Sequence, residues 1–355
     1  MSQTCCDSEN NCCCSCGEEQ DTARDAGQCA KQTIPVSTAL TFRDLLGAFK
    51  VRWGVGRANY RVEPGLYTIG APDENSPVLV SANYKLTFDT LRGNLAGLDC
   101  WLLILDTKGV NVWCAAGEGT FGTDELERRL RLTGLSEIVA HKQLILPQLC
   151  ATGVSAHEVR RRTGFSVLYG PVRASDIKTF IASGYEATKE MRTVKFTLRD
   201  RLVLTPVELT AALKPLLMIF GVLFLLNLFA AKPFGLYDFF AFVGAVIVGS
   251  VLTPLLLPVL PGRALSGKGW ILGAACTLIA LWLFGWLAPI QWLAALGYLL
   301  LFPAFAAYLA MNFTGCTPYT SPSGVRKEMR LALPFIVGSV AAGAALIIIH
   351  HLLGQ

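Results

Sequence analysis

Short apolar runs alternate with amphipathic segments over roughly the first 205 residues of the chain. Runs of strand length occupy residues 77–80, 100–105, 138–140 and 165–168. Apolar positions at helical spacing predict helices over residues 41–51, 124–132, 155–163 and 175–183. Strands that alternate with helices predict a Rossmann-like α/β fold with a mostly parallel sheet. Such a fold places its ligand at the carboxyl ends of the strands.

Long apolar stretches replace this alternation after residue 206. They cover residues 213–231, 236–260, 269–288, 290–311 and 331–353. Each stretch is near or above the length that a helix needs to cross a bilayer, so residues 206–355 are predicted to form an all-α transmembrane domain of about five helices. Charged side chains are almost absent from the stretches, which argues against an ion pump.

The connections between the apolar stretches predict an orientation. Two of them carry cationic residues, namely Arg263 with Lys268, and Arg326 with Lys327 and Arg330. By the positive-inside rule these connections face the cytoplasm. Five crossings then place the α/β domain in the cytoplasm and the C-terminus outside. The chain is thus predicted to be a multi-pass protein of the cell (inner) membrane, with the lipid bilayer as a partner.

The first 33 residues differ in composition from the α/β part and from the apolar part. They contain seven of the twelve cysteines but no apolar core of a secretory signal. We expect a disordered cysteine-rich tail, with a soft-metal trap as the alternative. Because the four-cysteine spacing of a ferredoxin is missing, no iron–sulfur cluster is placed in this chain. The net charge of only +5 gives no indication of a nucleic-acid partner.

The candidate chemistry lies in residues 111–117, Asn-Val-Trp-Cys-Ala-Ala-Gly, after the strand at 100–105. A helix follows, for which Asp124 is the expected cap and Glu127 completes a capping box. Cys114 has three readings: a buried core residue, a neighbour of a nucleotide loop, or a soft-metal ligand. The nucleotide reading rests on the glycines of a G-x-G-x-x-G pattern, Gly117, Gly119 and Gly122. It lacks the acidic residue expected about twenty positions later.

This heptapeptide resembles the signature of the mercury-methylating corrinoid proteins, the membrane-bound members of the acetyl-CoA-pathway corrinoid protein family. Further blocks of the chain resemble that family at residues 64–67, 76–85, 144–149 and 169–173. The likeness covers about residues 50 to 200 and extends to the apolar region that follows. Two residues depart from the family pattern, because Glu118 stands where lysine is usual and Ser81 where threonine is usual.

The resemblance implies a corrinoid-binding α/β domain over residues 34–205 that binds a cobalamin-type corrinoid. Cys114 would lie on a cap helix and be both the catalytic residue and the lower axial ligand of cobalt. The implied reaction is methyl transfer from the corrinoid to inorganic Hg(II), catalysed by a corrinoid-dependent methyltransferase. The residues implied to bind the cofactor are Ser81, Asn83, Asn111, Val112, Trp113, Cys114, Ala115, Ala116, Gly117, Leu146, Pro147, Gln148, Gly153, Gly170, Pro171, Val172 and Arg173.

The implied partners are a ferredoxin-like iron–sulfur reductase and a methyl-tetrahydrofolate-linked methyl donor, with Hg(II) as substrate. A strongly donating thiolate opposite the methyl group would favour its departure with the bonding electron pair. Two alternatives remain open. The same fold could carry a methyl group to a nucleophile in acetyl-CoA-type C1 metabolism. The chain could also be a non-enzymatic, membrane-anchored thiol module that binds metal through its N-terminal cysteines.

Overall fold

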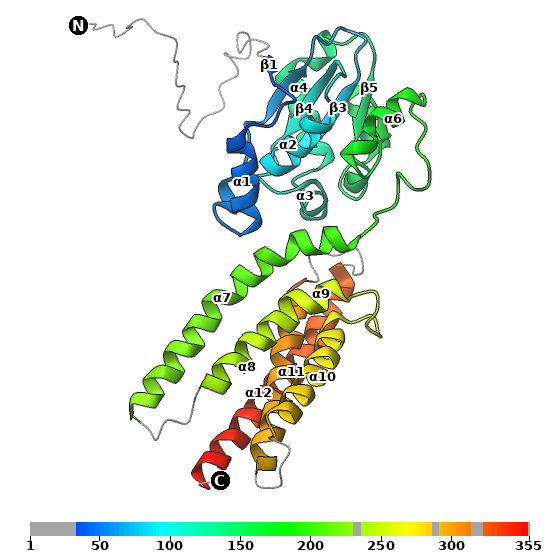
Figure 1. The fold of residues 1–355 in the computed structure, drawn as a ribbon. Coiled ribbons are helices and arrows are strands. Elements are labelled where there is room, and N and C mark those ends of the chain that lie inside the picture. Colours follow the sequence, from blue (N-terminus) through cyan, green and yellow to red (C-terminus); the bar gives the residue numbers. More distant parts are fainter. Residues whose placement is uncertain (1–32, 230–235, 286–290, 314–321, 354–355) are drawn as a thin grey trace, which may run out of the picture.

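The computed structural model describes residues 33–229, 236–285, 291–313 and 322–353. Within these ranges an α/β part is followed by a region of long apolar helices (Figure 1). The predicted tail over residues 1–33, including its seven cysteines, lies outside the described residues, apart from residue 33 itself. The general prediction of an α/β domain followed by a helical region is confirmed.

A six-stranded sheet forms the centre of the α/β part. Its order is β1-β2-β4-β3-β5-β6. The strands are β1 (Thr33–Pro35), β2 (Gly65–Ile69), β3 (Val78–Ala82), β4 (Cys100–Leu105), β5 (Gln143–Leu146) and β6 (Ser166–Tyr169). Only the β2–β4 pair is antiparallel. The sheet is therefore mostly parallel, as predicted.

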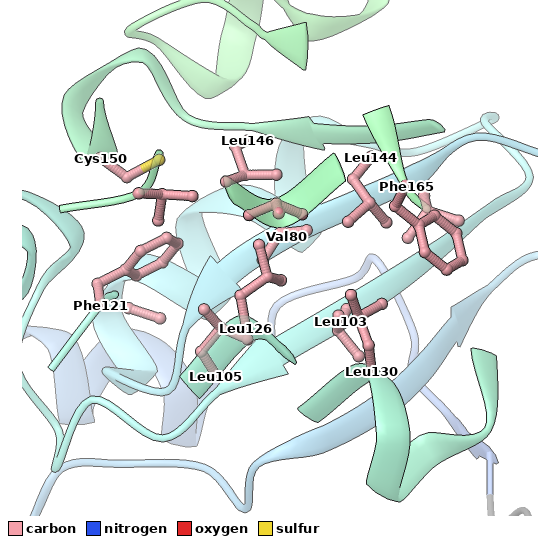
Figure 2. Packing of buried hydrophobic residues seen from close by; sticks show 14 of the residues in the cluster. Val80, Leu103, Leu105, Phe121, Leu126, Leu130, Leu144, Leu146, Cys150 and Phe165 are labelled. Atoms are coloured by element: carbon pink, nitrogen blue, oxygen red, sulfur yellow. The ribbon is translucent and has the colours of Figure 1, made fainter. Parts of the chain in front are cut away.

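Six helices belong to the α/β part. They are α1 (Phe42–Arg52), α2 (Lys85–Asn94), α3 (Val112–Glu118), α4 (Thr123–Thr133), α5 (Ala156–Thr163) and α6 (Ile177–Ala182). Residues of α3, α4 and α5 share a buried cluster with one face of the sheet, and residues of α2 and α6 share a second cluster with the other face. Figure 2 shows the first cluster, in which Phe121, Leu126 and Leu130 pack against Leu103 and Leu105.

The central strand β4 is apolar at every position because both of its faces are buried. Leu103 and Leu105 belong to the first cluster, whereas Leu102 and Ile104 belong to the second. Successive side chains of a strand point to opposite faces, so a strand covered by helices on both sides needs apolar residues at every position. This double burial explains why the predicted and observed bounds of β4 agree.

Two local predictions were wrong. Residues 138–140 do not form a strand; they follow the 3-10 helix Leu135–Glu137, and the strand is β5. Val139 is apolar because it packs into the first core cluster from this turn. Helix α4 is not capped by Asp124, since its N-cap is Gly122 and no side chain caps it. The Asp124 carboxylate instead pairs with Arg162 at 2.7 Å.

The predicted limits of α5 are confirmed. The Ser155 hydroxyl accepts a hydrogen bond from the backbone N–H of Glu158, so Ser155 is the N-cap. Gly164 ends the helix with a φ of 76°, in the left-handed region that glycine adopts without steric cost.

The C-terminal region consists of α7 (Leu198–Phe229), α8 (Leu236–Ile247), a π-helical turn (Val248–Leu252), α9 (Thr253–Leu255), α10 (Leu265–Leu283), α11 (Trp292–Asn312) and α12 (Pro322–Leu352). Four helical stretches among the described residues are long and apolar enough to cross a membrane, by length and composition: Leu198–Val222, Leu265–Leu283, Trp292–Asn312 and Gly324–Leu352. A shorter apolar helix covers Phe239–Leu255.

Two details of the predicted spans differ from the structure. The second stretch, residues 236–260, is helical only to Leu255, and Pro258 lies in the turn that follows. The predicted domain boundary at residue 206 falls inside α7, which begins at Leu198. The turn around Pro289 between the third and fourth stretches lies outside the described residues.

Small residues allow the apolar helices to approach closely. A Cβ atom added at Gly343 of α12 would lie 2.7 Å from the carbonyl oxygen of Gly297 in α11. A Cβ atom added at Gly297 would lie 2.7 Å from a side-chain carbon of Ile347. Helices in lipid associate through this kind of close packing between small residues.

We therefore predict that Gly343→Val lowers the free energy of unfolding of the helical region in detergent by about 1–3 kcal/mol, because the new side chain forces α11 and α12 apart. Gly338→Val is the matched control, since an added Cβ atom at this position of the same helix meets nothing within 4 Å. Thermal unfolding of the two purified variants measures the effect. Equal unfolding temperatures would contradict the predicted role of the contact.

Candidate functional site

A cavity of about 430 Å³ lies at the carboxyl ends of β3, β5 and β6. Helix α3 contributes part of its wall, and residues of α7 contribute another part. Figure 1 shows α3 on the side of the α/β part that faces α7. This is the edge at which an open parallel sheet usually binds its ligand.

Nine of the predicted cofactor-binding residues line this cavity. They are Ser81, Asn111, Val112, Trp113, Leu146, Pro147, Gly170, Pro171 and Val172. They come from four separate segments of the sequence, which the sheet brings together at one edge. The remaining predicted residues are not among the lining residues, and the structure gives most of them other contacts.

Asn83 holds the loop that leads into α3. Its side-chain oxygen accepts hydrogen bonds from the backbone N–H groups of Thr107 and Gly109 and from the Thr107 hydroxyl, at 2.9–3.1 Å. Its amide nitrogen donates to Asp106 at 3.2 Å. Asn83 is almost fully buried, so these bonds satisfy a side chain that water does not reach. It is therefore a positioning residue and does not line the cavity.

Helix α3 is fixed at both ends. The Asn111 side chain caps it by accepting a hydrogen bond from the backbone N–H of Cys114 at 2.9 Å. Gly119 ends it with a φ of 88°.

The buried side of α3 packs closely on the loop that contains Gly153. Ala115 and Ala116 are buried there, and a Cβ atom added at Gly153 would lie 2.8 Å from the carbonyl oxygen of Ala116. Ala115, Ala116 and Gly153 therefore hold the helix against the domain. Gly117 is open, since an added Cβ atom there would meet nothing within 4 Å.

Cys114 lies in the first turn of α3, directly after the lining residue Trp113. Its side chain is half-buried. Burial raises the pKa of the Cys114 thiol; the negative charge of Glu118 adds to this rise, while the Asn111 hydrogen bond and the positive charge of Arg57 oppose it. The thiol is therefore protonated at neutral pH until a metal or base takes its proton.

The other thiols of the described α/β part have a different environment. Cys100 and Cys150 are fully buried, and burial raises the pKa of each thiol to about 12. Cys150 packs in the first core cluster, as Figure 2 shows. Among the cysteines that the structure describes in this part, only Cys114 is not fully buried; its helix walls the cavity, although Cys114 itself is not a lining residue. The described residues contain no group of three or more His, Cys, Asp and Glu side chains that could hold a metal ion by themselves.

Two further predicted residues interact at the edge of the site. The Gln148 side-chain oxygen accepts a hydrogen bond from Arg192 at 3.2 Å. Arg173 pairs with Asp200 at 3.3 Å and donates to the carbonyl oxygen of Lys195 at 3.1 Å. Since Asp200 belongs to α7, Arg173 connects the α/β part with the start of that helix.

Gly117 of the G-x-G-x-x-G pattern lies inside α3, and the other two glycines belong to the turn between α3 and α4. Gly119 is the C-cap of α3 and Gly122 is the N-cap of α4. A Cβ atom added at Gly122 would lie 2.8 Å from the carbonyl oxygen of Gly119, so the turn is closed on itself. The tight turn explains these glycines without a nucleotide.

Several lining residues were missed by the sequence analysis. Arg52 and Arg57 come from the end of α1 and the 3-10 helix after it, and Tyr84 precedes α2. Val203, Leu204 and Val207 come from α7. Tyr84 lies inside the resembling block at 76–85, which was a usable signal. The α7 residues gave none, because no resembling block covers them and the predicted boundary at residue 206 divides their helix between two domains.

Residues 53–181 match the family described as CO dehydrogenase/acetyl-CoA synthase delta subunit, CdhD. The acetyl-CoA decarbonylase/synthase complex subunit gamma of Methanocaldococcus jannaschii is 35% identical over 127 residues, which are 35% of this chain and 26% of the relative. The subunit gamma of Methanopyrus kandleri is 38% identical over 127 residues, 35% of this chain and 27% of the relative. The chain thus spans about a quarter of the length of these curated relatives.

These matches correct the assignment made from the heptapeptide. The matching family and the relatives are subunits of an acetyl-CoA-forming or acetyl-CoA-cleaving complex, and they give no support to a mercury-methylating protein. That assignment was wrong, and Hg(II) as the substrate loses its basis with it. The similarity supports the alternative reading in acetyl-CoA-type C1 metabolism. Over residues 53–181, the chain is similar to the CdhD family of corrinoid-related subunits.

Proposed function

We propose that the chain binds a corrinoid at the carboxyl edge of its sheet and carries a methyl group to a nucleophilic acceptor in acetyl-CoA-type C1 metabolism. The cavity at this edge, walled by the helix that carries the half-buried Cys114, is the observation that carries the proposal. It lies within the stretch that matches the CdhD family, apart from the α7 residues and Arg52.

The residues around the cavity fit the chemistry of a corrinoid. A corrinoid presents a broad, largely apolar face and a cobalt ion that accepts a ligand from the protein. Apolar side chains dominate the lining, and Gly170 and Ser81 add little bulk to it. The described residues that line the cavity include no histidine. The Cys114 sulfur is therefore the soft donor that the chain offers next to the cavity.

Each residue of this site has a separate task in the proposal. Cys114 donates its sulfur to the metal after losing the thiol proton. Asn111 fixes the turn that carries the sulfur through its bond to the Cys114 N–H. Arg57 favours the thiolate through its positive charge, whereas Glu118 disfavours it. When bound, the corrinoid would supply the cobalt that takes up and releases the methyl group.

The relatives' names support the need for partners. They are subunits of an acetyl-CoA decarbonylase/synthase complex, so we propose that this chain also works with other proteins. In the proposal, a methyl-tetrahydrofolate-linked system supplies the methyl group and a ferredoxin-like iron–sulfur protein supplies electrons.

The apolar helices serve as a membrane anchor in this proposal. Four described helical stretches have the length and composition to cross a bilayer, and Phe239–Leu255 adds a shorter one. Arg326, Lys327 and Arg330 lie in the first turns of α12 and Arg263 lies before α10. With these cationic residues on the cytoplasmic side, the α/β part is cytoplasmic and the C-terminus lies outside. Proteins that exchange methyl groups and electrons with the cavity would then approach from the cytoplasm.

The first prediction concerns the methyl acceptor. We expect the full chain in detergent, loaded with methylcorrinoid, to transfer its methyl group to a nucleophilic thiol or metal-cluster acceptor. Loss of the methylcorrinoid absorbance together with mass spectrometry of the product measures this transfer. Transfer to Hg(II) with none to the nucleophilic acceptors would overturn the proposed acceptor class and leave the corrinoid site intact.

The second prediction concerns the ligand of the metal. Replacing Cys114 by Ala should abolish the cysteine-dependent shift of the Co(III) absorbance bands and weaken corrinoid binding at least about tenfold, because a direct ligand is lost. Cys276→Ala is the matched control, since this thiol lies in α10, away from the cavity. Identical spectra for Cys114→Ala and the unaltered protein would rule out the proposed ligand.

The third prediction follows from the raised pKa of the Cys114 thiol. Because the free thiol is protonated below that pKa, each ligation event releases one proton. Corrinoid affinity should therefore fall about tenfold for each unit by which the pH is lowered in this range. Corrinoid titrations at pH 6, 7 and 8 measure how the affinity changes with pH. In Cys114→Ala the affinity should not change over this range. A pH dependence that persists in this variant would assign the proton to another group.

A further inference from the structure

One corner of the cavity is lined by three polar side chains that the proposed ligation does not use. Arg52 is the last residue of α1, Arg57 opens the 3-10 helix Arg57–Asn59, and Tyr84 directly precedes α2. All three line the cavity whose other walls are mostly apolar. Three chain segments thus bring hydrogen-bond donors to one corner.

The Tyr84 hydroxyl is buried and has no protein partner. The residue is only 6% exposed, and its oxygen forms no hydrogen bond with any described residue. Burial raises the pKa of Tyr84, while the positive charges of Arg57 and Arg52 lower it in part. The hydroxyl therefore keeps its proton at neutral pH and is a donor. Buried hydroxyl groups normally have partners, so one without a partner in a cavity wall indicates a ligand atom.

The two arginines carry positive charge that nearby carboxylates do not balance. No ion pair joins Arg52 or Arg57 to a carboxylate among the described residues, whereas Arg92, Arg129 and Arg162 are all paired. Arg57 is half-buried, and its charge acts on both Tyr84 and Cys114. A guanidinium group presents several N–H donors in a planar fork that matches an oxyanion.

We propose that Arg52, Arg57 and Tyr84 form a phosphate-binding subsite of the cavity. The corner offers donors and positive charge, and a phosphate group offers acceptors and negative charge. The proposal rests on the proposed function in one respect, because the phosphodiester of a corrinoid's nucleotide tail is one source of the phosphate. Free inorganic phosphate is the other source.

The test compares two corrinoids on the full chain in detergent. Cobalamin contains the phosphodiester, and cobinamide lacks the nucleotide tail. Arg57→Gln should weaken cobalamin binding about tenfold, the usual effect of losing a charged hydrogen bond. It should weaken cobinamide binding much less, because cobinamide loses only the positive charge that Arg57 places beside the Cys114 thiolate. Arg160→Gln is the matched control, because this arginine is exposed on α5 and does not line the cavity.

Inorganic phosphate separates the two sources. In the unaltered protein it should compete with cobalamin, and in Arg57→Gln this competition should disappear. Phosphate binding that depends on Arg57, with equal affinities for the two corrinoids, would support the subsite and identify free phosphate as its ligand. Equal weakening of both corrinoids, without Arg57-dependent phosphate binding, would overturn the subsite.

Tyr84→Phe provides a readout that a structural role would not give. Because the variant removes an unpaired buried hydroxyl, the melting temperature of the ligand-free protein should rise while cobalamin affinity falls. A fall in melting temperature with unchanged affinity would overturn the role of Tyr84. If the unaltered protein bound neither corrinoid, the proposed function would fail, and the phosphate titration would still decide the subsite.

Discussion

The buried side-chain amide of Asn83 is the contact on which the site depends. Strands β3 and β4 are parallel neighbours, so their carboxyl ends lie side by side. Asn83 follows β3, and its amide binds four groups of the loop that follows β4, on Asp106, Thr107 and Gly109. Because these groups are shielded from water, each bond would be costly to lose. The loop direction fixed in this way determines where α3 begins.

A second buried network holds the same loop from the other side. The Glu125 carboxylate accepts a hydrogen bond from the backbone N–H of Asp106 at 2.9 Å and pairs with Arg129 at 2.7 Å. Arg129 is only 8% exposed, so this pair is shielded from solvent. Helix α4 is thereby attached to the end of β4. Polar contacts made by residues outside the cavity thus help to position the helix that carries Cys114, together with the Asn111 cap.

The parts of the fold that could be predicted are those with a local physical cause. The bounds of β4 follow from burial on both faces, and those of α5 from the Ser155 cap and the left-handed Gly164. Strands β1 and β2 were missed because neither is a continuous apolar run: β1 has three, mostly exposed residues, and glycine and threonine interrupt β2. The strand predicted at residues 138–140 was wrong because an apolar residue in a turn can fill a core as well as one in a strand.

For the site, too, the sequence predicts some features and not others. The family resemblance predicted two kinds of residue as cofactor-binding. Some line the cavity, such as Ser81 and Gly170, and others support its walls, such as Asn83 and Gly153. A motif does not distinguish the two groups, because both are needed for the same geometry. It also does not specify the acceptor of the proposed methyl transfer, because in that proposal the acceptor comes from a partner or from solution.

Helix α7 forms one wall of the cavity, so the cavity is not built by the α/β part alone. Val203, Leu204 and Val207 line it, and Asp200 pairs with Arg173 at the end of the α/β part. A Cβ atom added at Gly54 would lie 3.2 Å from the Thr210 hydroxyl, so the turn after α1 also lies against α7. The helix that leads into the apolar region therefore closes one side of the cavity. A movement of α7 relative to the sheet would change the cavity wall directly, which couples the proposed membrane anchor to the proposed cofactor site.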